Sequence, residues 1–165
     1  MSTQIVNEPD PQYVVAEGEK RAIRTIKLFI SLGFIAEAGF LLMGLILFPD
    51  NGPLVWRLVW ALGLCGIGMG AAVGGLTYLV SARFTPGSTG AYIMTAVSST
   101  LLFSVCQTLC WGLDHNVGLN YWGSIEMPLL FLIKGYTAAL IAGILGSFLL
   151  NSVTGARFLA RLKVF

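Results

Sequence analysis

Four long apolar runs decide most of what this chain can fold into. A helix needs about 20 apolar residues to cross the hydrocarbon core of a bilayer. Each run reaches that length, at residues 28–48, 58–80, 91–113 and 127–150. The runs contain almost no proline, whereas the segments between them hold the glycine, proline and asparagine residues that end helices. The sequence therefore predicts an all-α integral membrane protein with four transmembrane helices and short loops.

The composition agrees with this prediction. Of the 165 residues, 56% are hydrophobic and only 11% are charged, whereas soluble globular domains carry roughly 25% charged residues. The formal net charge of +2 gives no reason to expect a nucleic-acid partner. The first apolar run is longer than the core of about 7–15 residues in a cleavable signal peptide, so we expect it to remain as an anchor.

The basic residues indicate how the helices are oriented, because lysine and arginine favour the cytoplasmic side of a membrane. Eight of them fall on one side of the predicted membrane, and Arg57 falls on the other. The eight are Lys20, Arg21, Arg24, Lys27, Arg83, Arg157, Arg161 and Lys163. Both termini are therefore predicted to face the cytoplasm.

A transmembrane domain of residues 20–155 is flanked by two tails. Residues 1–19 are polar and acidic and show no helical or strand period, so we expect this tail to be disordered or bound to a partner. Residues 156–165 interleave bases with large apolar side chains, which is typical of a short basic amphipathic helix on anionic lipid headgroups. The alternative is that the same basic side chains simply snorkel to the membrane surface.

Glu37 interrupts the first apolar run near its centre, in the stretch FIAEAGFLLM. A charge at this depth costs at least ~2.5 kcal/mol on insertion scales, which makes the residue a functional candidate. Three interpretations are open: a protonated or paired carboxyl that bonds a neighbouring helix, a proton or cation site of a transporter, or a contact with another subunit. Lys134, about 10 Å deep in the fourth run at 1.5 Å per residue, is the candidate ion-pair partner.

Small residues form a ridge on the second helix. Gly66, Gly70 and Gly74 recur every four residues within GLCGIGMGAAVGG and share one helix face. Such small-residue faces let two membrane helices approach closely. A weaker version on the fourth helix is formed by Ala139, Gly143 and Ser147. We expect both to be packing surfaces.

A polar stripe lies on the third helix. Its members are Thr100, Ser104, Gln107, Thr108 and Trp111. Such stripes usually supply hydrogen bonds between membrane helices, although this one could instead line a polar pathway. The three cysteines, Cys65, Cys106 and Cys110, fall inside apolar runs, so we expect buried thiols that behave as small hydrophobes.

Little in the sequence points to catalysis. His115, the only histidine, follows the third helix and is a weak candidate ligand for haem, pigment or metal; a hydrogen-bonded loop histidine is the favoured interpretation. Neither a nucleophile elbow, a phosphate loop nor a zinc motif is present. We expect no enzyme activity and no metal site, and the sequence names no cofactor.

Two stretches within residues 19–86 carry a family resemblance. EKRAIRTIKLFISLGFIAEAGF followed by LGLCGIGMGAAVGGLTYLVSARFTP resembles the membrane anchor of the actinobacterial Rieske subunit of menaquinol–cytochrome c reductase. The matching positions are Lys20, Arg21, Ala22, Gly39, Phe40, Gly66, Gly68, Gly70, Ala71 and Pro86. The cluster-binding domain of that family is missing, so none of its ligands transfers. The resemblance implies a helix pair in a respiratory or electron-transfer assembly of a bacterial inner membrane.

These observations favour a non-catalytic accessory subunit of a larger integral membrane complex. In this hypothesis the glycine face of the second helix packs in the complex, and the partners are other membrane subunits and lipid. The alternative is a small proton-coupled transporter that works as a homodimer through Glu37. A central glutamate in the first of four helices is similar to the design of small multidrug-resistance exporters, a likeness limited here to Glu37 after Ala36.

Overall fold

The computed structural model describes residues 11–47, 54–113 and 126–162, and these are almost entirely helical, with no strand among them. The helices are α1 (Pro11–Leu47), α2 (Leu54–Leu58), the π-helix η1 (Val59–Gly68), α3 (Met69–Ser81), α4 (Thr89–Leu113), α5 (Glu126–Asn151) and α6 (Val153–Arg161). The prediction of an all-α chain is confirmed. The α2, η1 and α3 segments follow one another without a break and form one long helix.

Three helices in the described part of the chain are long and apolar enough to cross a membrane: Glu17–Met43, Leu54–Ser81 and Thr89–Cys110. A fourth qualifies when Tyr136–Asn151 and Val153–Arg161, which are bent by 92°, count as one span. In the apolar 18-residue stretch of each of these three spans, between 28 and 39% of the residues are buried inside the chain. Most of their apolar surface therefore faces outward, a pattern that suits a lipid environment and that water-soluble monomers avoid.

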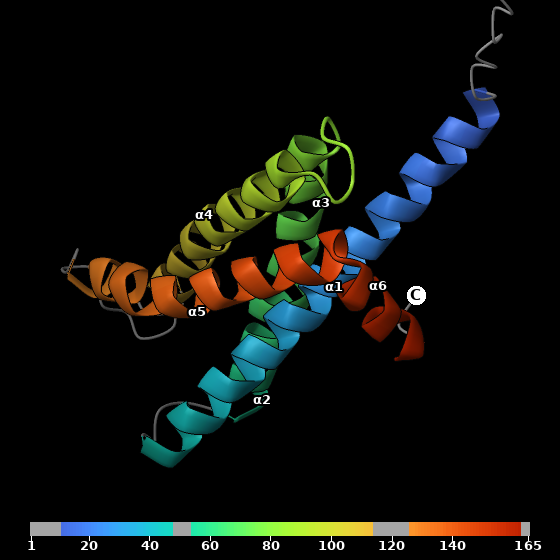
Figure 1. The fold of residues 1–165 in the computed structure, drawn as a ribbon. Coiled ribbons are helices and arrows are strands. Elements are labelled where there is room, and N and C mark those ends of the chain that lie inside the picture. Colours follow the sequence, from blue (N-terminus) through green and yellow to red (C-terminus); the bar gives the residue numbers. More distant parts are fainter. Residues whose placement is uncertain (1–10, 48–53, 114–125, 163–165) are drawn as a thin grey trace, which may run out of the picture.

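The helices form two antiparallel pairs (Figure 1). The first pair is α1 with the α2–η1–α3 helix, and the second is α4 with α5. The pairs meet in a core around Phe29 and Val73, both fully buried, with Phe103 of α4 and Ala139 and Ala142 of α5. The rings of Phe29 and Phe103 are 5.7 Å apart between centroids, so they join the two pairs directly.

The α1 helix begins earlier than the sequence predicts. Residues 11–19, expected to lack a fold of their own, are its first turns, and α1 extends well beyond the other helices at this end (Figure 1). Two physical effects explain the difference. Glu17, Glu19 and Lys20 are good helix formers, and a helix that the apolar run has already nucleated grows at little cost.

The C-terminal helix also begins at a different residue from the one that the sequence predicts. The predicted amphipathic helix of residues 156–165 begins at Val153, because Ser152 caps it: the Ser152 hydroxyl accepts a hydrogen bond of 2.8 Å from the backbone N–H of Gly155. Leu159 packs against Leu28 of α1 and Leu149 of α5. The basic residues Arg157 and Arg161 remain exposed, and residues 163–165 lie outside the described part.

Candidate functional site

Glu37 is enclosed by the helices of its own chain. Its side chain is only 3% exposed. Gln107, on α4 and itself 6% exposed, donates a hydrogen bond of 3.3 Å from Nε2 to Oε1 of Glu37. An amide N–H can donate to this oxygen whether the carboxyl is charged or neutral. Two residues that the sequence analysis singled out separately are thus brought together across the boundary between the helix pairs.

Two cysteine thiols lie beside this pair. Cys65 of η1 is fully buried, and its thiol is hydrogen-bonded to that of Cys110 on α4. Cys110 is also close enough to Glu37 for an electrostatic interaction. All three cysteines lie in the described part of the chain and none forms a disulfide; Cys65 is buried as expected, whereas Cys106 and Cys110 are only partly buried.

Two hydroxyls of the α4 stripe bond back to their own helix. Ser104 donates to the carbonyl of Thr100 at 2.9 Å, and Thr108 donates to the carbonyl of Ser104 at 2.7 Å. Such bonds satisfy a buried hydroxyl without joining two helices. The hydroxyl of Thr100 is buried against Gly143 of α5 and has no partner within the described residues. Among these four residues, Gln107 is the one whose side chain bonds a different helix.

Two candidates from the sequence cannot be placed against Glu37. Lys134 belongs to α5, but its side chain lies outside the described part of the structure, so the predicted ion pair stays a prediction. His115 also lies outside the described residues. Among the residues that are described, no group of three histidine, cysteine, aspartate or glutamate side chains could hold a metal ion.

The glycine ridge faces α1. A Cβ atom built on Gly70 would lie 2.7 Å from the Cα of Ile30, and one built on Gly74 would lie 2.7 Å from the Cα of Ile26. These distances are shorter than side chains tolerate. Gly66 is also close to the α1 backbone. The glycines therefore allow the two backbones to approach to a distance that any larger residue would prevent.

This geometry corrects one part of the accessory-subunit hypothesis. The glycine face was expected to pack in a larger complex, but α1 of the same chain covers it. Gly33 of α1 adds to the contact, since a Cβ atom there would lie 2.6 Å from the carbonyl oxygen of Gly66. The face is consequently not available to another subunit.

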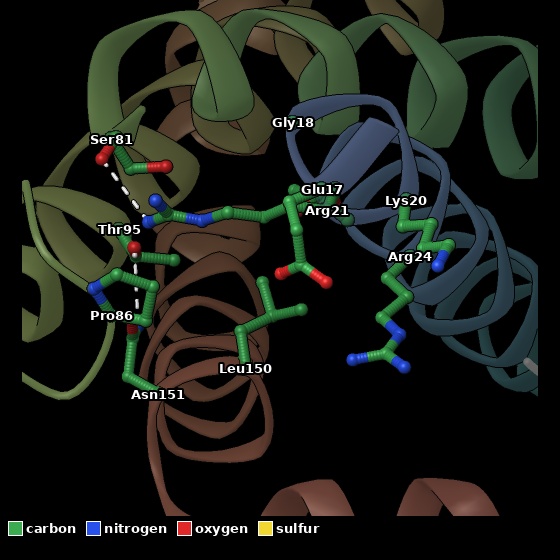
Figure 2. A pocket seen from close by; sticks show the side chains of 11 residues that line it. Glu17, Gly18, Lys20, Arg21, Arg24, Ser81, Pro86, Thr95, Leu150 and Asn151 are labelled. Atoms are coloured by element: carbon green, nitrogen blue, oxygen red, sulfur yellow. Dashed lines mark hydrogen bonds between the residues drawn. The ribbon is translucent and has the colours of Figure 1, made fainter. Parts of the chain in front are cut away.

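A cavity of about 470 Å³ lies at the basic end of the molecule, between α1, the end of α3, the start of α4 and the end of α5 (Figure 2). Three cations and one acid from α1 line it: Lys20, Arg21, Arg24 and Glu17. Ser81, Thr95 and Asn151 add polar groups from the other helices, and Leu150 is an apolar part of the wall.

Arg21 fixes one wall of the cavity. Its guanidinium donates hydrogen bonds of 3.1 Å to the carbonyl of Phe84 and 3.2 Å to the carbonyl of Ser81, and Figure 2 shows the side chain reaching across from α1 to Ser81. Ser81 is the last residue of α3. The Ser81 carbonyl also accepts a hydrogen bond of 3.1 Å from the backbone N–H of Phe84. Arg21 therefore adds a second donor at the end of α3, where a cation complements the helix dipole.

In the sequence, these cations indicate the orientation of the chain in the membrane. A more local signal was present, because residues 17, 20, 21 and 24 have the i, i+3, i+4, i+7 spacing that places them on one helix face. What the spacing could not reveal is that the ends of α3 and α5 would meet this face and form the other walls of an open cavity. That juxtaposition depends on tertiary packing.

Comparisons with protein families, with curated proteins and with solved structures find no match to this chain.

Proposed function

We propose that this chain is a four-span, non-catalytic accessory subunit of a larger integral membrane complex, with both termini in the cytoplasm. The observation that carries the proposal is the hydrogen bond from Gln107 to Glu37. It satisfies the central carboxyl inside the chain, as expected of a group that holds helices together.

The hydroxyl groups of α4 support the same reading. Ser104 and Thr108 bond to carbonyls of their own helix and are not directed toward a common reacting point. The resemblance to the Rieske anchor suggests a respiratory or electron-transfer complex as the parent assembly. In that setting the chain would supply membrane helices and no redox centre.

Extraction in a mild detergent tests the proposed role. We expect the native protein to purify in fixed stoichiometry with other membrane proteins. Size-exclusion chromatography with mass spectrometry of the peak measures this directly. Recovery as a free monomer or simple homodimer would contradict the proposal.

The proposed topology needs its own test. Single cysteines introduced at residues 4 and 164 of a variant without native cysteines should both react with a membrane-impermeant maleimide only after the cytoplasmic side is opened. Labelling of the two positions from opposite sides would show that the chain does not cross the membrane an even number of times.

The proton-coupled transporter is the second candidate. The burial of Glu37 in the middle of a predicted span, next to the polar stripe of α4, is the observation that favours it. Glu37→Gln keeps the size and hydrogen bonding of the side chain but removes its titration. If the chain is a transporter, this variant should abolish proton-coupled flux in vesicles; unchanged flux would remove Glu37 from the mechanism.

A further inference from the structure

We infer that the cavity between α1 and the ends of α3 and α5 binds a phosphate-bearing anion, with Lys20 and Arg24 as the binding cations. The inference requires membrane insertion, but it does not depend on the proposed role as an accessory subunit.

The charge of the cavity is the first argument. Three of its lining side chains are cations and one is an acid, which leaves an excess of positive charge. Arg21 is already bonded to two backbone carbonyls. The side chains of Lys20 and Arg24, in contrast, make no hydrogen bond or ion pair with the other described residues. Both are exposed and lie on the α1 side of the cavity (Figure 2), free to donate to an oxyanion.

The size of the cavity fits a ligand larger than a water molecule. A volume of about 470 Å³ falls within the range of roughly 300–1,000 Å³ that is typical of small-molecule sites. On the wall opposite Lys20 and Arg24, Asn151 donates to the hydroxyl of Thr95 at 3.3 Å. This bond holds two polar groups of that wall in place, while the exposed cations of α1 line the other side.

The orientation of α6 indicates how deep the cavity lies relative to the membrane surface. Because α6 is turned by 92° from α5, it would lie in the membrane plane when α5 crosses the membrane. Phe158 of α6 and Leu162, which directly follows the helix, are 52 and 53% exposed and lie beside its arginines. Leu159 packs on Leu28, which places the membrane surface close to the start of the apolar part of α1.

The side chains of Lys20 and Arg24 can then reach the headgroups. They precede Leu28 by eight and four residues, or about 12 and 6 Å along a helix at 1.5 Å per residue. The headgroup zone occupies roughly 5–8 Å on each side of the hydrocarbon core, and both side chains are long enough to reach it. The phosphate of an anionic lipid headgroup and a free phosphate ion share the chemistry that these cations would recognise.

Binding to purified protein in a non-ionic detergent tests the inference. The probes are dihexanoyl phosphatidylglycerol, dihexanoyl phosphatidylcholine and inorganic phosphate, and the readout is the rise in unfolding temperature with probe concentration. We expect saturable stabilisation by phosphatidylglycerol. In Lys20→Gln/Arg24→Gln the affinity should fall about 30-fold, which corresponds to the loss of two lysine or arginine contacts with anionic lipid.

Two further variants separate the cavity from the general charge of this end of the chain. Arg83→Gln removes the same charge as Arg24→Gln from an exposed position that does not line the cavity, and its affinity should match that of the wild type. Glu17→Gln removes the acid from the cavity and should tighten binding several-fold. A loss in Arg83→Gln equal to that in Arg24→Gln, or no loss in the Lys20/Arg24 variant, would overturn the inference.

The three probes identify the source of the phosphate. Stabilisation by phosphatidylglycerol alone assigns the site to a lipid headgroup. Stabilisation by inorganic phosphate that is lost in the Lys20/Arg24 variant assigns it to the free ion. Equal stabilisation by phosphatidylglycerol and phosphatidylcholine, without an effect of phosphate, would show that no anion is recognised. A free monomer in the extraction experiment would leave these results unaffected, so the two proposals can fail separately.

Discussion

The α1 helix carries polar side chains in two places, and these differ in their burial and in their hydrogen-bond partners. In its middle, Glu37 is 3% exposed and bonded to Gln107, and close contacts with α3 lie on the turns before it. Toward its N-terminus, Lys20 and Arg24 line a cavity, and their side chains make no hydrogen bond or ion pair with the other described residues. A polar group in hydrocarbon must be satisfied by protein, whereas one at the membrane surface can rely on water or lipid headgroups.

The largest loss of stability is expected from a larger side chain at the close contact between α3 and α1. Gly70→Leu would force a side chain into the backbone of α1 at Ile30, where even a Cβ atom would come within 2.7 Å of the Cα. We expect a loss of about 3 kcal/mol or more in the free energy of unfolding, at the upper end of the cost of overpacking. Unfolding in detergent micelles, followed by circular dichroism, measures it.

Gly75→Leu is the matched control. Gly75 belongs to the same helix, and nothing outside its own helix lies within 4 Å of a Cβ atom built there. This variant should retain the stability of the wild type or gain from the better helix propensity of leucine. Equal losses in the two variants would mean that the close approach of α1 and α3 does not contribute to stability.

A smaller effect is expected at the Glu37 contact. Gln107→Leu keeps an apolar body of similar size but removes the donor to the buried carboxyl, so the free energy of unfolding should fall by about 1–2 kcal/mol. Ser104→Ala removes a hydroxyl that bonds only to its own helix and should cost less. If both variants are equally stable, the bond between the helix pairs has no role in holding them together.

Sequence reasoning identified some of these features and missed others for physical reasons. Apolar runs of bilayer length fix the helical class, because backbone groups in lipid must bond within their own segment. Glu37 and Gln107 were each recognised as unusual, since polar residues are rare in such runs. Their contact was not foreseen, because periodicity gives the face of a helix but not the face of its neighbour.

The same reasoning explains the error at the glycine ridge. Spacing at every fourth residue identifies a surface that needs a close neighbour, and it carries no information on whether that neighbour belongs to the same chain. Here the complementary signal lies on α1, where Gly33 meets the backbone at Gly66. Reading Gly33 together with the ridge would have favoured an internal contact over a contact with another subunit.

The smallest effect is expected at the basic end, and it distinguishes a structural cation from a ligand-binding one. Arg21→Gln removes the hydrogen bonds to the carbonyls of Phe84 and Ser81. Since Arg21 is only partly buried, we expect a loss of about 1 kcal/mol in the free energy of unfolding without added lipid. Arg24→Gln should leave this stability unchanged, because Arg24 has no partner among the described residues, and should weaken only anion binding. If Arg24→Gln destabilises the lipid-free protein as much as Arg21→Gln does, Arg24 contributes to the stability of the fold. The contrast between the buried, hydrogen-bonded Glu37 and the exposed cations near the N-terminus of α1 would then be wrong.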